Sequence, residues 1–287
     1  MKMYFKKLFG LVIFLLFIAL LLNVTCFAKD NPYPFDVKIS GNGEKSIIFI
    51  PGFACSGDVW NDTKINFENS YKCYTLTMSG FAGAAPQPDP TFRKWEEGIV
   101  SYIIDNNIDK PVIIGHSMGG GLALAIAADY PELISKIVVV DALPCLAALM
   151  DPNFKSVENP DCSNMLSQMK SVSDEDFYKR QKSTMPMLLA DTSMTETVVN
   201  WSVISDRTTF AKMYCDFSNT DLRQNISSVK CPALILLESY FTNMKPVITE
   251  QYKNLKTADL RYSTKGLHFI MFDDNEWYDE QLKSFLN

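Results

Sequence analysis

The chain has 287 residues, 47% of them apolar, and a formal net charge of −6. A chain of this length and composition buries one large core, and its acidic balance argues against nucleic acid or anionic membrane surfaces as partners. The sequence shows no internal repeat and no low-complexity run, so nothing in it indicates a solenoid or a disordered protein.

Residues 1–28 are predicted to lie outside the folded domain. Three lysines precede an apolar run from Leu8 to Leu22, and Cys26-Phe27-Ala28 offers a small-x-small cleavage site. This pattern is typical of an export signal, so we expect a secreted, periplasmic or cell-surface protein. The apolar run is also long enough for an uncleaved membrane anchor, which would be the only contact with a membrane. A lipoprotein attached through Cys26 is the weaker alternative.

Six cysteines follow residue 28. In an exported protein they meet an oxidising environment in which they can pair, and about 15 connectivities are open. Buried free thiols are an equal alternative, because no cysteine has metal-ligand spacing with a histidine. The six are Cys55, Cys73, Cys145, Cys162, Cys215 and Cys231.

The first elements of the domain are predicted to be strands. Residues 35–40 and 46–50, separated by Gly41-Asn42-Gly43, predict a hairpin at the edge of a sheet. The second run leads into Pro51-Gly52-Phe53-Ala54, and residues 71–78 predict a further strand.

Residues 91–107 predict an amphipathic helix packed on the sheet. Phe92, Trp95 and Ile99 fall on one helical face. Glu96 and Glu97 fall on another, where we expect them to be solvated.

The most informative stretch is residues 111–130. A β-branched run up to Gly115 predicts a buried strand, and an apolar run from Gly119 predicts a buried helix. Between them, Gly115-His116-Ser117-Met118-Gly119 has the G-x-S-x-G pattern of a nucleophilic serine. Small neighbours permit a strained turn that exposes the Ser117 hydroxyl and places it, with the Met118 N–H, at a helix N-terminus. The alternative is a buried turn whose serine only caps the helix.

A serine hydroxyl needs a base to become a good nucleophile. The chain has two histidines, and His116 must point away from Ser117 because the two are adjacent. That leaves His268, which follows the predicted strand 257–263 near the end of the chain. If an imidazole activates Ser117, His268 supplies it.

Together these features resemble the serine hydrolases of the α/β-hydrolase fold, the esterase- and lipase-like enzymes. The resemblance spans about residues 36–287. It rests on Ile50-Pro51-Gly52-Phe53 with Trp60 downstream, the turn from Gly115 to Gly120, the strand ending at Asp141, and His268 before a terminal helix. It implies an α/β fold with a mostly parallel central sheet flanked by helices. The domain would span residues 29–287, with a helical cap inserted after Asp141 over approximately residues 142–220.

The resemblance also implies the remaining site residues. The backbone N–H of Phe53 would join that of Met118 as an oxyanion hole. Most relatives carry the triad acid after the strand that here ends at Leu237, where this chain has Glu238 and no aspartate. Some carry it one strand earlier, where Asp141 lies. We therefore expect Asp141 as the acid, with Glu238 as the alternative; Asp206, Asp221 or no acid at all are the other possibilities.

The expected activity is hydrolysis of an ester or related acyl bond through an acyl-enzyme, without a metal or organic cofactor. The substrate would be a small-molecule ester or acyl compound. The predicted cap holds seven methionines, whose flexible apolar side chains favour an apolar substrate, although methionine is more often simply a core residue. One alternative is an aminopeptidase of the same fold, whose cap carboxylates would bind the substrate amine; the candidates are Glu158, Asp174, Glu175 and Asp176. Another is a binding protein that keeps the fold without turnover, as the displaced acid suggests.

Overall fold

A computed structural model describes residues 32–286 of the chain. The predicted export signal or anchor lies outside these residues. Among the described residues, no helix has both the length and the hydropathy needed to cross a bilayer.

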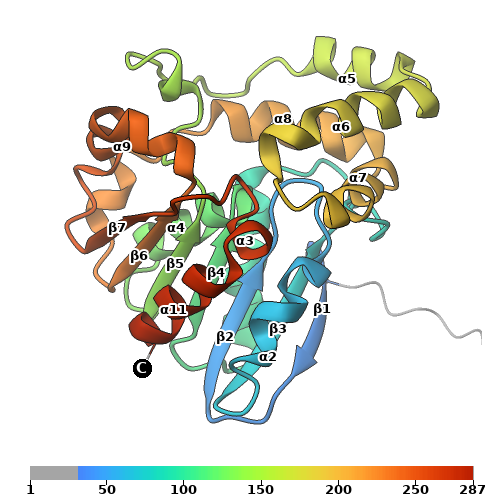
Figure 1. Ribbon diagram of the computed structural model, residues 1–287. Coiled ribbons are helices and arrows are strands. Elements are labelled where there is room, and N and C mark those ends of the chain that lie inside the picture. Colours follow the sequence, from blue (N-terminus) through green and yellow to red (C-terminus); the bar gives the residue numbers. More distant parts are fainter. Residues whose placement is uncertain (1–31, 287) are drawn as a thin grey trace, which may run out of the picture. The chain divides into compact units, whose positions relative to one another are not determined.

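Within this described part, seven strands form one sheet in the order β1-β3-β2-β4-β5-β6-β7 (Figure 1). Only β1 and β3 run antiparallel; every other neighbouring pair is parallel. This confirms the mostly parallel sheet. The strands are β1 (Phe35–Ser40), β2 (Lys45–Ile50), β3 (Tyr71–Met78), β4 (Val112–His116), β5 (Lys136–Val140), β6 (Ala233–Leu237) and β7 (Ala258–Tyr262).

The predicted hairpin of β1 and β2 is wrong. Both strands pair with β3, which lies between them, antiparallel to β1 and parallel to β2. The connection between β1 and β2 requires its two glycines, because the start of β3 packs against them. A Cβ atom on Gly41 would lie 2.3 Å from the carbonyl oxygen of Tyr71, and one on Gly43 would lie 2.0 Å from that of Ser70.

Helices cover both faces of the sheet, and a further group is inserted between β5 and β6 (Figure 1). The inserted helices α5 to α8 gather beyond one end of the strands, as expected for a cap that follows Asp141. The helices are α2 (Asn61–Ile65), α3 (Phe92–Asp105), α4 (Met118–Asp129), α5 (Ser163–Ser171), α6 (Asp174–Leu188), α7 (Thr195–Val203), α8 (Arg207–Asn219), α9 (Lys245–Tyr252), α10 (Ile270–Asp273) and α11 (Asn275–Leu286).

Side chains of the central strands alternate between two cores, as a sheet buried on both faces requires. Each fully buried aliphatic side chain stabilises the fold by about 1.5–3 kcal/mol. The core shared with α3 and α4 contains Ile48, Ile50, Ile113, Ile137 and Val139. The core shared with Trp60 and α11 contains Ile47, Phe49, Ile114, Val138 and Val140.

Helix α3 begins at a Thr91 cap, whose side chain accepts a hydrogen bond from the Lys94 N–H. The expectation that Glu96 is solvated is wrong, because its side chain is only 3% exposed. Helix α4 packs beside this part of α3, and Arg93 forms ion pairs with both Glu96 and Asp129. Burial outweighs the attraction of Arg93 and raises the pKa of Glu96 to about 7.

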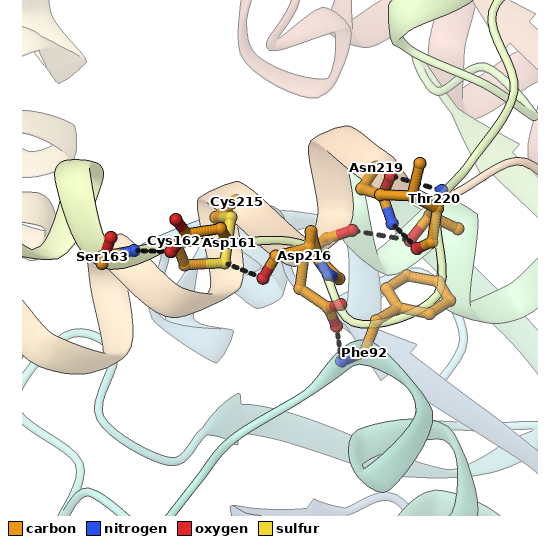
Figure 2. The surroundings of a disulfide bond; sticks show 10 residues. Phe92, Asp161, Cys162, Ser163, Cys215, Asp216, Asn219 and Thr220 are labelled. Atoms are coloured by element: carbon orange, nitrogen blue, oxygen red, sulfur yellow. Dashed lines mark hydrogen bonds between the residues drawn. A yellow bond between two sulfur atoms is a disulfide. The ribbon is translucent and has the colours of Figure 1, made fainter.

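A disulfide between Cys162 and Cys215 joins the start of α5 to α8 (Figure 2). Helix α5 buries no side chain of its own. Polar contacts hold the segment before it: Asn219 exchanges two hydrogen bonds, of 2.8 and 3.0 Å, with the backbone of Val157. Helix α8 is in turn bonded to the start of α3 through Asp216 and the Phe92 N–H. The other four cysteines after residue 28 are buried free thiols.

Candidate active site

The predicted site residues follow the carboxyl ends of neighbouring parallel strands, the edge where open α/β sheets bind ligands. Ser117 follows β4, Asp141 follows β5 and Glu238 follows β6. Phe53 lies beyond the end of β2, and His268 lies between β7 and α10. All five line one cavity of about 510 Å³.

Ser117 occupies a strained turn between β4 and α4. Its φ of 52° and ψ of −121° lie in a region that non-glycine residues rarely adopt. Its N–H donates to the Val140 carbonyl at 2.8 Å, which holds the turn against β5. A Cβ atom on Gly119 would lie 2.3 Å from the Ile50 carbonyl oxygen, so only glycine lets α4 start this close to β2. The side chain of Ser117 therefore leaves the sheet at the cavity.

Asp141 and His268 meet at the cavity wall. The Nδ1 atom of His268 lies 2.6 Å from Oδ2 of Asp141, whose side chain is 2% exposed. The other carboxylate oxygen of Asp141 accepts the Glu238 N–H at 2.8 Å. The backbone of Asp141 has a φ of 48° and is fixed by a 2.8 Å hydrogen bond to the Leu236 carbonyl. Both oxygens of this buried carboxylate thus have partners.

The Glu238 side chain differs from that of Asp141 in its contact with His268. In the described chain, no hydrogen bond joins the Glu238 carboxylate to His268. Burial and the charge of Asp141 raise the pKa of Glu238 to about 7, although His268 opposes the rise. Burial also disfavours a charged His268, but the hydrogen bond and charge of Asp141, with a contribution from Glu238, raise the pKa of His268 above its ordinary value.

The other carboxylates considered from the sequence do not line the cavity. Asp206 caps α8, accepting the Thr209 N–H at 2.7 Å, and Asp221 pairs with Arg223. The four cap carboxylates that an aminopeptidase would use are also absent from the lining. The structure therefore brings Asp141 and Glu238, and none of these others, to the cavity.

Phe53 and Met118 hold the predicted oxyanion donors. Met118 is the first residue of α4, so its N–H has no acceptor within the helix. Neither this N–H nor that of Phe53 meets an acceptor elsewhere in residues 32–286. The Phe53 ring packs on Phe81 and Phe210, with centroid distances of 5.0 and 4.6 Å, and so fixes its loop.

The cap supplies most of the apolar wall of the cavity. Two of the seven cap methionines, Met185 and Met187, are among the lining residues, as are Gln181 and Ser202. No sequence pattern predicts a role for Gln181 and Ser202, because only the folded cap turns them toward the site. The lining includes carboxylates but no lysine or arginine. No cluster of three or more His, Cys, Asp and Glu side chains in the described part is arranged to bind a metal ion.

Comparison with known families agrees with the fold. The α/β hydrolase fold family matches residues 45–286, and the chain belongs to that family.

Individual relatives are distant. A pimeloyl-[acyl-carrier protein] methyl ester esterase of Aliivibrio fischeri (strain MJ11) is 22% identical over 85% of this chain and 95% of its own length. The enzyme of that name from Wigglesworthia glossinidia brevipalpis is 26% identical, but the match spans 52% of this chain and about half, 54%, of that relative. Among solved structures, the enol-lactonase from Burkholderia xenovorans LB400 superposes with a TM-score of 0.72 at 14% identity, covering 88% of this chain and 96% of that one. An esterase from Exiguobacterium antarcticum has a TM-score of 0.70 at 17% identity, covering 88% and 94%. At such identities the structural likeness concerns the fold.

Proposed function

We propose that this protein is a serine hydrolase that cleaves carboxylic esters with Ser117, His268 and Asp141. One observation carries the proposal: the hydrogen-bonded Asp141–His268 pair and the strained Ser117 turn line the same cavity. The names of the relatives and structural neighbours, two methyl ester esterases, an enol-lactonase and an esterase, support ester chemistry.

The roles follow from the hydrogen bonds. A carboxylate can only accept, so His268 donates its Nδ1 proton to Asp141 and keeps a lone pair on Nε2. That nitrogen takes the Ser117 proton as the serine oxygen attacks the ester carbonyl. The Phe53 and Met118 N–H groups stabilise the oxyanion, and each such donor contributes about 2.7–4 kcal/mol in enzymes of this kind. His268 then protonates the leaving alcohol, and water releases the acid from the acyl-enzyme by the same steps.

The cavity favours a neutral, apolar substrate. Its volume of about 510 Å³ is in the usual range for small-molecule sites. Because carboxylates but no lysine or arginine line it, an ester bearing a negative charge close to the reacting carbonyl would be repelled.

The test is covalent labelling with a fluorophosphonate, together with hydrolysis of short aryl esters. We expect labelling at Ser117, abolished in Ser117→Ala, with loss of turnover. Ser101→Ala is the matched control, because Ser101 lies on an exposed face of α3, and it should label fully. An unlabelled wild-type protein would refute the proposal and favour a binding protein that retains the fold.

We also propose that the protein is exported. The sequence of residues 1–28 supports this, and the Cys162–Cys215 disulfide is typical of proteins that fold in oxidising compartments. Sequencing the mature N-terminus tests the idea: cleavage after Ala28 is expected, an intact Met1 in the membrane fraction would indicate an anchor, and an intact Met1 in the cytosol would refute export.

A further inference from the structure

His116 is not the predicted base, yet its ring contacts that of His268. It is the last residue of β4 and is completely buried. Its Nε2 lies 2.9 Å from the backbone carbonyl oxygen of His268, and the two ring centroids are 4.6 Å apart. A ring next to Ser117 in sequence thus contacts the residue proposed to activate it.

The direction of this hydrogen bond is determined by chemistry. Burial and the nearby His268 hold the pKa of His116 well below its ordinary value, so the ring is neutral. A carbonyl oxygen can only accept, so Nε2 carries the hydrogen and Nδ1 does not. Nδ1 is buried and has no partner among the described residues. It faces Gly52, where an added Cβ would lie 2.6 Å from it, so only glycine leaves space for the ring at this position.

The segment that carries His268 depends on such contacts because it has no regular structure. It connects β7 to α10, and the Phe269 N–H donates to the Leu188 carbonyl of the cap at 3.1 Å. Within the described chain, the His268 carbonyl has no hydrogen-bond donor other than His116.

We propose that His116 is a positioning residue: its Nε2–H bond to the His268 carbonyl holds the His268 imidazole in line between Asp141 and Ser117. This inference rests on the proposed function. His116 does not touch the substrate or transfer a proton. It acts through the backbone of His268, so its loss changes the rate of serine attack more than substrate affinity.

Three substitutions separate this role from simple packing. His116→Gln can place an amide N–H near the Nε2 position, whereas the shorter side chain of His116→Asn reaches only the Nδ1 position. His116→Phe keeps a ring but removes the donor. Misplacing a reacting group by about 1 Å costs up to ~100-fold in rate. We expect the Asn and Phe variants to lose ~10- to 100-fold in kcat and in the rate of fluorophosphonate labelling at nearly unchanged KM, and the Gln variant to retain most of both.

The low-field proton resonance of the Asp141–His268 hydrogen bond gives a readout that does not require turnover. It should persist in His116→Gln and shift or broaden in His116→Asn. Equal losses in the Gln and Asn variants, or wild-type rates in the Asn and Phe variants, would overturn the inference. If Phe unfolds the protein, the Gln and Asn pair still decides. A wild-type protein that neither labels nor turns over would instead refute the proposed function, and the resonance would still test the contact.

Discussion

Replacing Asp141 by asparagine tests the proposed acid, and the structure determines how the new amide must lie. In the native site one carboxylate oxygen accepts the Glu238 N–H at 2.8 Å and the other accepts from His268 at 2.6 Å. An asparagine would keep its carbonyl oxygen toward the Glu238 N–H, because its NH₂ group cannot accept there. The NH₂ group would then face Nδ1 of His268.

That orientation selects the wrong tautomer of the histidine. Nδ1 would accept from the amide, so the hydrogen would move to Nε2, which could no longer take the Ser117 proton. In a triad, this exchange lowers kcat by about 10⁴-fold, or about 5.5 kcal/mol in the barrier. We expect this loss with little change in KM.

The assay is steady-state hydrolysis of a short aryl ester, with the fluorophosphonate labelling rate as a second readout. Glu238→Gln is the matched control, because Glu238 lines the same cavity and its side chain makes no hydrogen bond to His268. It should stay within about tenfold of wild type. If Asp141→Asn keeps near-native turnover while Glu238→Gln abolishes it, the acid is Glu238 and the reasoning is wrong.

Three further predictions concern pH and the cap. Because the pKa of His268 is raised above 6.5 and the base must be neutral, kcat/KM should fall as pH drops through a value above 6.5. Glu238→Gln should move this limb to lower pH, and a wild-type limb below 6.5 would contradict the prediction. Burial raises the pKa of Glu96 to about 7, so the stability that protonated Glu96 contributes is present below its unfolded pKa and is lost as pH rises toward 7. In urea unfolding near pH 8, Glu96→Gln should therefore stabilise the protein by about 2–3 kcal/mol. An equal gain near pH 4 would argue against titration as the cause. Reducing the Cys162–Cys215 disulfide, which spans 53 residues, should lower stability by up to about 4 kcal/mol, whereas the double variant Cys162→Ser, Cys215→Ser should not respond to reductant; a wild-type protein insensitive to reductant would rule out this contribution.

Features encoded by neighbouring residues were predictable. The bounds of β3 agree with the predicted strand 71–78, because β-branched and aromatic runs bounded by turns leave few alternatives. The Ser117 turn was also predictable, since the glycines around it are required by contacts within a short stretch and with β2.

Features that depend on distant segments were not predictable. No pattern in residues 35–50 predicts that β3 will lie between β1 and β2 in the sheet. The burial of Glu96 depends on α4 packing beside α3, and the choice among cysteine pairings depends on how α5 lies against α8. Only the folded chain distinguishes Asp141 from Glu238, because the relative positions of the ends of β5 and β6 and of the His268 loop determine which carboxylate reaches the imidazole.

Asp141, which follows β5, binds His268, so the segment after β6 does not have to supply the hydrogen-bond partner of His268. This segment, the short helix η5 (Ser239–Met244) with Glu238 before it, presents Glu238 and Phe241 to the cavity. Its side chains can therefore vary without removing the partner of His268, while the backbone N–H of residue 238, which any residue except proline provides, continues to hydrogen-bond to Asp141. Selectivity and chemistry can then be altered separately in this architecture, and residues 238–241 are the natural place to begin redesigning which esters enter.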